Sequence, residues 1–289
     1  MNWFALSCVT ALTQAVKDTF LKRSMAALDA TTAMIGYCLS ASVFLWLAVA
    51  AGPPVSLASS FWTWLAVGGV LGGVTYWLYG LALKAGDLSL TLPMLAFTPL
   101  FLLVTSPLTL GEFPEPGGLC GIALVVAGAY VLNLRERKSG VLGPIKALWT
   151  RRGPRLMLAV AAIWSIGANL DKLGLRASSP LFWGAAVYTA TFLALLGPRL
   201  VKKARAGRRL PGLPSWPVAV AGLLEAIGIV CQMHALPLTQ VSYVIAVKRL
   251  SIVFGVLLGA LVLREPDLAH RLPGALLMVA GVFFIAVFG

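Results

Sequence analysis

Ten long apolar stretches, one after another, constrain this sequence more than any other feature. Each holds about 20 mostly apolar residues, the length that a helix needs to cross the hydrocarbon core of a membrane. The stretches cover residues 2–21, 30–51, 60–83, 88–108, 116–134, 154–175, 180–198, 215–236, 239–262 and 271–288. Only 11% of the 289 residues are charged, against roughly 25% in soluble domains. The sequence therefore predicts an all-α integral membrane protein with ten transmembrane helices and no separate soluble domain.

The basic residues gather in loops that all follow odd-numbered spans. Lys22 and Arg23 follow span one, and the stretches 135–155 and 199–209 hold seven and six basic residues. Loops rich in Lys and Arg stay in the cytoplasm. We therefore expect a multi-pass protein of the cell inner membrane with both termini on the non-cytoplasmic side. The same rule explains the net charge of +13 without a nucleic-acid partner.

The second half of the chain repeats the first half after a shift of 153 residues, without a gap. A pattern of Glu, eight residues, Gly, six residues and Gly occurs in both halves. The matching pairs are Glu112 and Glu265, Gly121 and Gly274, and Gly128 and Gly281. Each repeat holds five spans, and an odd number inverts the second repeat relative to the first. We expect a first repeat over 1–134, a basic cytoplasmic linker over 135–153 and a second repeat over 154–289. Inverted repeats are typical of secondary transporters, which bind substrate near the midplane between the halves.

Two five-helix repeats that each carry the Glu…Gly…Gly pattern resemble the drug/metabolite transporter superfamily, in particular its ten-helix EamA-type members. The resemblance covers essentially the whole chain. It implies a 5+5 fold with a substrate cavity built mainly by helices 3, 4, 8 and 9 and their symmetry partners. It also implies substrates such as amino acids, quaternary amines, sugar phosphates or lipid-linked sugars. Many members are assigned cytoplasmic termini, the reverse of the orientation that the charges here predict.

Two adjacent cations, Lys248 and Arg249, lie at the middle of span nine. A charge at this depth is costly, so intramembrane charges are functional candidates by default. Arginine offers a planar fork to a phosphate or carboxylate, and lysine adds a point charge. The pair is also similar to the phosphate-binding Lys-Arg pair on helix nine of the plastid phosphate translocators, which implies an anion-binding role. The alternative is a structural ion pair with a buried carboxylate.

Glu225, at the middle of span eight, is the expected partner in that alternative, and it could equally carry a proton or line the cavity. Gln232 lies seven residues further on and shares its face. Further polar side chains within the spans are candidate substrate contacts. They are Tyr76, Tyr79, Asn169 and Tyr243. Three prolines in span four, Pro93, Pro99 and Pro107, predict a kinked helix that lines the cavity.

Charged residues at corresponding ends of spans one and six predict a gate at each mouth. In the predicted orientation, Asp18 and Glu265 lie inside, whereas Asp171 and Glu112 lie outside. The two acidic span ends each have a lysine neighbour, Lys17 and Lys172. Alternating access requires such gates, although helix capping and interface anchoring explain the same residues.

Several motifs of other function classes are missing from the sequence. No Walker A motif is present, and neither a metal-ligand cluster nor a nucleophile elbow appears. We therefore expect neither an enzyme nor a bound cofactor. The expected partners are the lipid bilayer and the substrate, and the chain is expected to be a monomer or a homodimer.

Three transport functions remain open from the sequence. The first is a secondary transporter of a small polar metabolite that carries an anionic or phosphate group. The second is a flippase for a phospholipid or a polyprenyl-phosphate-linked sugar, which would use the same basic pair. The third is an amino-acid or organic-cation exporter in which Glu225 binds the amine.

Overall fold

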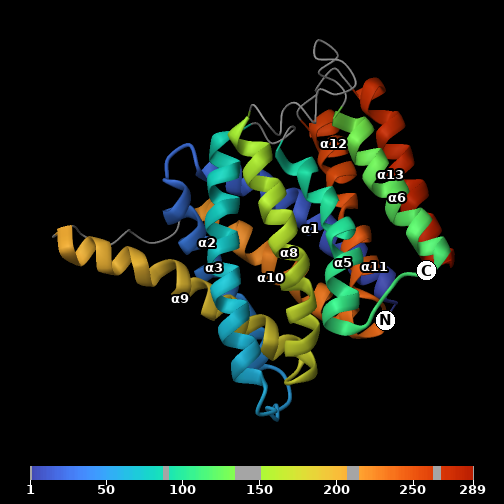
Figure 1. Cartoon of the computed structure of the whole chain (residues 1–289). Coiled ribbons are helices and arrows are strands. Elements are labelled where there is room, and N and C mark those ends of the chain that lie inside the picture. Colours follow the sequence, from blue (N-terminus) through green and yellow to red (C-terminus); the bar gives the residue numbers. More distant parts are fainter. Residues whose placement is uncertain (1, 87–90, 134–150, 207–214, 263–267, 289) are drawn as a thin grey trace.

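The computed structural model describes residues 2–86, 91–133, 151–206, 215–262 and 268–288, which are almost entirely helical (Figure 1). The first half supplies α1 (Trp3–Ser24), α2 (Ala30–Ala50), α3 (Phe61–Ala85), the 3-10 segment η1 (Leu92–Phe97), α5 (Thr98–Leu110) and α6 (Pro116–Asn133). The second half supplies α8 (Arg152–Arg176), α9 (Pro180–Ala206), α10 (Trp216–Ala235), the short η3 (Leu236–Leu238), α11 (Val241–Lys248), α12 (Leu250–Val262) and α13 (Leu268–Phe288). The predicted ten-span, all-helical fold is confirmed, with span four formed by η1 and α5 and span nine by α11 and α12.

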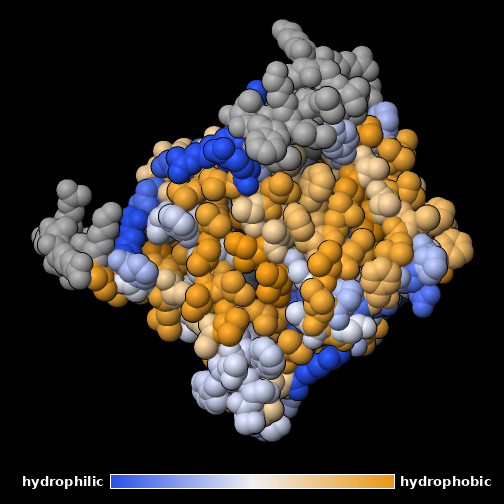
Figure 2. Space-filling model, in the orientation of Figure 1, coloured by the Kyte–Doolittle hydropathy of each residue, from blue (hydrophilic) through white to orange (hydrophobic). Residues whose placement is uncertain are grey.

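The surface of the molecule has the polarity of a membrane protein. Figure 2 shows hydrophobic residues across the middle of the visible face and hydrophilic residues toward its two ends. In the described part of the chain, six helices are long and apolar enough to cross a membrane. The apolar parts of α6 and α13 are shorter, and α1 carries four charged residues in its second half.

Helix packing follows the inverted repeat. The first helix of each repeat packs on the third helix of the other, so α1 lies against α10 and α8 lies against α3. The second helices, α2 and α9, pack on each other, and so do the fifth helices, α6 and α13. The contacts therefore have the two-fold pattern that the 153-residue shift predicts. The larger apolar core lies among α1, α2, α3, α8, α9 and α10, which also enclose the polar site.

The repeated glycines are explained by the crossing of α6 and α13. A Cβ atom on Gly121 would lie 2.6 Å from the carbonyl oxygen of Gly281, and one on Gly128 would lie 2.6 Å from that of Gly274. Small residues let two membrane helices approach to backbone contact. The motif that revealed the repeat thus builds the contact between the last helices of the two halves.

Spans four and nine are both interrupted at corresponding positions. Span four begins as the 3-10 segment η1 and becomes α-helical at Thr98, next to Pro99. In span nine, the amides of Arg249 and Ile252 bond to carbonyl oxygens three residues earlier, where a regular helix would use the fourth. The shift of 153 residues maps Arg249 onto Ala96, the residue next to the end of η1. Short 3-10 stretches within helices often mark hinges.

Asp29 ties the start of α2 to α9. Its carboxylate caps α2 by accepting from the backbone amide of Thr32 at 3.0 Å. It also accepts two hydrogen bonds from the Arg199 guanidinium, at 2.9 and 2.7 Å. Burial acts to raise the pKa of Asp29, but the hydrogen bonds from Arg199 and Thr32 outweigh it and lower that pKa to about 2.

Candidate functional site

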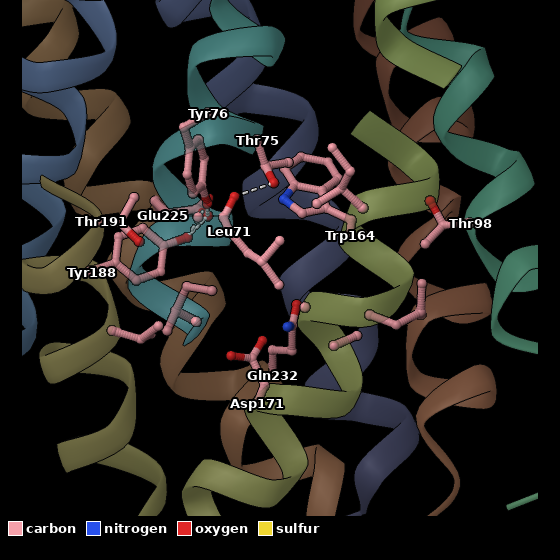
Figure 3. Close-up of a pocket in the computed structure, with 18 of the residues that line it drawn as sticks. Leu71, Thr75, Tyr76, Thr98, Trp164, Asp171, Tyr188, Thr191, Glu225 and Gln232 are labelled. Atoms are coloured by element: carbon pink, nitrogen blue, oxygen red, sulfur yellow. Dashed lines mark hydrogen bonds between the residues drawn. The ribbon is translucent and has the colours of Figure 1, made fainter. Parts of the chain in front are cut away.

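A cavity of about 90 Å³ lies inside the bundle between α3, α8, α9, α10 and the interrupted span nine. Its polar lining comes from Gln14, Thr75, Tyr76, Thr98, Asp171, Tyr188, Thr191, Glu225, Gln232, Lys248 and Arg249, most of which are labelled in Figure 3. The volume holds several water molecules or a group the size of a phosphate. A larger metabolite would require the helices to move apart.

Glu225 lies at the polar centre of the bundle. The Lys17 ammonium donates to Glu225 Oε2 at 2.7 Å. The hydroxyl of Tyr76 donates to Oε1 at 3.1 Å, and that of Tyr188 donates to the same oxygen. In Figure 3, Tyr76 and Tyr188 converge on this carboxylate from α3 and α9. The ring of Tyr37 lies under the Lys17 ammonium, 5.5 Å from its centroid, within the range of a cation–π contact. Both carboxylate oxygens of Glu225 therefore already accept hydrogen bonds from the protein.

Asp18 belongs to the same buried network. Tyr79 donates to Asp18 Oδ1 at 2.5 Å, and the Gln14 amide donates to both carboxylate oxygens at 3.3 and 3.2 Å. Lys17 lies 3.8 Å away. The sequence placed Lys17 and Asp18 at the inner mouth, but both are buried, with 1% and 4% of their surface exposed. Lys17 reaches the middle of α10 because α1 continues to Ser24, beyond the predicted end of span one.

Lys248 and Arg249, the two cations of span nine, line the cavity at the 3-10 turn that interrupts this span. The Lys248 ammonium donates to the side-chain oxygen of Gln232 at 2.7 Å. The Arg249 guanidinium donates to Thr98 Oγ1 at 3.3 Å, which joins the interrupted regions of spans nine and four. Arg249 is 2% exposed, and its Nε has no hydrogen-bond partner within the described structure.

The sequence left open a structural ion pair between Glu225 and the two cations of span nine, but the structure pairs Glu225 with a different residue. Glu225 pairs with Lys17, although Lys248 and Arg249 were the expected partners. Neither of these cations has a carboxylate oxygen within 4.0 Å among the described residues. Within the described part of the chain, no protein carboxylate therefore pairs directly with either charge.

Asp171 also lines the cavity, on α8. Its Oδ1 accepts a hydrogen bond from the indole nitrogen of Trp183 at 2.9 Å. In Figure 3 it lies near Gln232, on the side of the cavity away from Tyr76. Its repeat counterpart, Asp18, accepts from two side chains and lies near Lys17, so the two equivalent carboxylates have different surroundings.

A cluster at the end of the bundle where an outer mouth was predicted joins α8 to the loops that follow α5 and precede α11. The Lys172 ammonium lies 2.6 Å from Glu112 Oε1 and donates to the carbonyl oxygen of Thr239 at 2.7 Å. The other oxygen of Glu112 accepts from the amide of Val241 at 3.1 Å, and Arg176 lies 3.9 Å from Glu112. We call these five residues the mouth cluster.

The other end of the bundle has a related contact. Lys22 of α1 donates to the carbonyl oxygens of Leu83 and Gly86 at the end of α3, at 2.5 and 2.7 Å. Gly86 is the repeat counterpart of Thr239, which accepts from Lys172. At each end, therefore, a lysine of the first helix holds a carbonyl at the end of the third. Glu265, the predicted acid at this mouth, lies outside the described residues.

Some predicted contacts lie away from the cavity lining. Tyr79 is occupied by Asp18, and Asn169 accepts from Ser106 at 2.8 Å. The hydroxyl of Tyr243 accepts from the amide of Glu115 at 3.1 Å, at the start of α6. The lining residues Tyr188, Thr98 and Thr191 were not predicted. Tyr188 carried a usable signal, since it is a tyrosine within an apolar span, as Tyr76 is.

The described residues contain no group of three His, Cys, Asp or Glu side chains that could hold a metal ion. The polar cavity can instead offer hydroxyls, amides and unpaired cations to a polar ligand. Such groups bind and orient a molecule by hydrogen bonds and charge.

Comparisons with known proteins agree with this architecture. The EamA-like transporter family matches residues 1–134 and 151–287, one match for each half of the chain. One solved structure, described only as the crystal structure of a protein, aligns with 100% of this chain and 99% of its own. The TM-score is 0.71 at 17% identity, so this likeness shows a shared fold alone. No curated protein matches the chain.

Proposed function

The chain belongs to the EamA-like transporter family, and on that premise we propose that it carries a small polar metabolite with a phosphate or carboxylate group. Members of this family are membrane transporters of small molecules. We infer a secondary transporter that works by alternating access, with the cavity as its substrate site.

The observation that carries this proposal is the position of Lys248 and Arg249 and their lack of a carboxylate partner among the described residues. Both line the cavity, and neither has a protein carboxylate within 4.0 Å in the described part of the chain. Arg249 keeps an unpaired donor, Nε, in a buried position, and a buried donor without a partner is costly. An anion in the cavity could accept a hydrogen bond from that donor and lie beside both cations.

The surroundings of Glu225 favour an anion over an amine. A substrate ammonium would have to compete with Lys17, which lies 2.7 Å from Glu225 Oε2. Tyr188 and Tyr76 occupy the other oxygen. An organic-cation exporter built on Glu225 would therefore have to break this network in each cycle.

The two ends of the bundle support alternating access. The mouth cluster ties α8 to the start of α11 through Glu112 and Lys172. At the other end, Lys22 ties α1 to the end of α3. We propose that these contacts open in turn, with the 3-10 segments of spans four and nine as hinges.

The charge bias of the loops supports a location in the cell inner membrane with both termini outside. In that orientation the mouth cluster faces the non-cytoplasmic side, and Lys22 faces the cytoplasm. The lysine-to-carbonyl contacts are then the outer and inner gates.

Thermal unfolding of the purified protein with inorganic phosphate tests the anion site. Phosphate should raise the unfolding temperature of the wild type, since a ligand that binds only the folded state stabilises it. The double variant Lys248→Ala, Arg249→Ala should lose that increase. Arg249→Lys should lose part of it, because lysine keeps the charge without the fork.

Lys84→Ala is the matched control, because Lys84 is a basic residue at the end of α3, outside the cavity. It should keep the full phosphate response. A double variant that keeps the response would overturn the anion site. Farnesyl phosphate distinguishes a lipid substrate, since only a lipid-phosphate flippase should respond to it more strongly than to inorganic phosphate.

A further inference from the structure

The formal charges of the described side chains around the cavity add up to zero. Among the described residues, six charged side chains lie in or beside the polar centre of the bundle. The cations are Lys17, Lys248 and Arg249, and the anions are Asp18, Asp171 and Glu225. A bound anion would add a negative charge that nothing in this set balances. Unbalanced charge is expensive to hold away from water, so anion binding calls for a compensating positive charge.

The three carboxylates differ in how firmly their charge is held. Glu225 lies 2.7 Å from Lys17, and Asp18 lies 3.8 Å from the same ammonium. Asp171 accepts one hydrogen bond, from Trp183. It has no cation within 4.0 Å in the described part of the chain. Asp171 is therefore the cavity carboxylate that loses the least when its charge is removed.

Several helices that pack against α8 bring charged or titratable groups to the cavity, whereas η1 and α5, which also pack against α8, bring none among the described residues. The titratable or charged ones that line the cavity are Tyr76 of α3, Tyr188 of α9, Glu225 of α10, and Lys248 and Arg249 of span nine. Beyond the cavity, Lys172 follows Asp171 in sequence but is held by Glu112. Among the charged groups of this set, Asp171 and Lys248 are the two whose charge is not fixed by an ion pair or by the strong basicity of arginine.

We propose that Asp171 binds one proton when a singly charged anion binds to Lys248 and Arg249, so that proton and substrate cross the membrane together. This inference rests on the proposed anion site. The Asp171 carboxylate takes a proton from water on the side to which the cavity is open and becomes a neutral acid. The loaded cavity then has the same total charge as the empty one. The acid loses its proton when the anion leaves on the other side.

The affinity of the purified protein for methyl sulfate, measured against pH, tests this step. Methyl sulfate keeps one negative charge across the neutral range, so the probe itself does not titrate. The wild-type affinity should fall about tenfold per pH unit on the alkaline side, as linkage of one proton requires. Binding in a weakly buffered solution should also take up about one proton per anion, and this second measurement needs no variant.

Asp171→Asn reproduces the neutral acid. The amide oxygen of asparagine can still accept from Trp183, so the variant should fold and unfold at the same temperature as the wild type. It should bind methyl sulfate with the low-pH affinity of the wild type at every pH. Asp29→Asn, a carboxylate outside the cavity that pairs with Arg199, should keep the wild-type dependence on pH.

The other outcomes separate the proton step from the anion site. A pH dependence that survives in Asp171→Asn would assign the proton to another group, such as Lys248, and overturn the proposal. A folded Asp171→Asn that no longer binds methyl sulfate would also overturn it, because Asp171 would then hold the substrate itself. Wild-type binding without proton uptake would overturn the proton step and leave the anion site standing. If the wild type binds neither methyl sulfate nor inorganic phosphate, the anion site fails as well.

Discussion

Lys17 of α1 and Glu225 of α10 form a buried ion pair, with 2.7 Å between the ammonium nitrogen and the carboxylate oxygen. Their side chains are only 1% and 6% exposed. Two opposite charges attract more strongly away from water, but each is costly there without the other. Because α1 belongs to the first repeat and α10 to the second, the pair also joins the two halves of the bundle.

Replacing Lys17 by methionine should therefore destabilise the fold strongly. Lys17→Met leaves the Glu225 carboxylate buried without its cation, and breaking a buried pair in this way costs about 3–5 kcal/mol. Adding Glu225→Gln removes the isolated charge, so the double variant should recover most of the loss. Denaturant unfolding of the detergent-solubilised protein measures all three free energies.

Lys84→Met is the control for this comparison, because Lys84 is an exposed lysine that donates to a backbone carbonyl at 3.2 Å. Its effect should stay within about 0.5 kcal/mol, as for most surface substitutions. If the double variant is as unstable as Lys17→Met, the loss does not come from the isolated Glu225 charge, and the account of the pair is wrong.

The crossing of α6 and α13 gives a second prediction. A Cβ on Gly128 would lie 2.6 Å from the carbonyl oxygen of Gly274, so Gly128→Ala should force the helices apart. The expected cost is about 1–3 kcal/mol, the range for overpacking a tight contact. Gly197→Ala on α9 is the matched control, since nothing lies within 4 Å of its added Cβ. It should be neutral or stabilise by up to about 1 kcal/mol through helix propensity. Equal effects of the two substitutions would contradict the close crossing.

The sequence was sufficient for the architecture because hydropathy and repetition are properties of the chain itself. The apolar windows located the helices, and the spacing of Gly121 and Gly128, found again at Gly274 and Gly281, revealed the repeat. The partner of Glu225 was not predictable in the same way. Lys17 lies 208 residues away, and its position near the end of a window suggested a mouth. Only the packing of α1 on α10 brings the two together.

The interruption of span nine could be predicted only indirectly, from the other half of the chain. Arg249 has neither proline nor glycine beside it, so no local signal marks the break. Prolines do mark the break in span four, next to Thr98. The 153-residue shift carries that position to the neighbourhood of Arg249. Applying the repeat to the proline pattern would therefore have predicted both breaks.

Two substitutions of Asp29 separate the stability that comes from its helix cap from the stability that comes from its ion pair. Asp29→Asn keeps an oxygen for the Thr32 amide but removes the ion pair with Arg199, in which the Asp29 side chain is half exposed. This substitution should lower the free energy of unfolding by no more than about 1 kcal/mol. Asp29→Ala also removes the cap and should cost about 1 kcal/mol more. Equal losses would show that the cap contributes nothing.

The lowered pKa of Asp29 sets the sign of its pH effect. The folded value is about 2 and the ordinary value is about 3.9. The stabilisation is therefore complete above the ordinary value and is lost as the pH falls toward the folded value. Unfolding free energies of the wild type and Asp29→Asn should differ by a constant amount between about pH 5 and pH 8. A difference that changes within this range would contradict the assignment.

The mouth cluster predicts a local change in hydrogen exchange. Glu112 holds the amide of Val241 and the ammonium of Lys172. Glu112→Ala removes both contacts, so amides at the start of α11 should exchange faster, whereas those at the middle of α10 should not change. Glu112→Gln keeps an oxygen for Val241 and should have a smaller effect. Mass spectrometry of exchanged peptides measures both regions. Unchanged exchange at the start of α11 in Glu112→Ala would show that the cluster does not hold this segment in place.

The orientation gives the last prediction. Thirteen basic residues in the stretches 135–155 and 199–209 should hold these loops in the cytoplasm. Alkaline phosphatase, which is active only outside the cytoplasm, should be active when fused after Gly289. A green fluorescent protein at the same position should stay dark, and the signals should reverse for fusions within 199–209. Replacing the basic residues of both stretches by glutamine should weaken the bias and mix the two signals. Bright fluorescence after Gly289 would reverse the orientation and make the Glu112–Lys172 contact the cytoplasmic gate, while leaving the cavity and its charges unchanged.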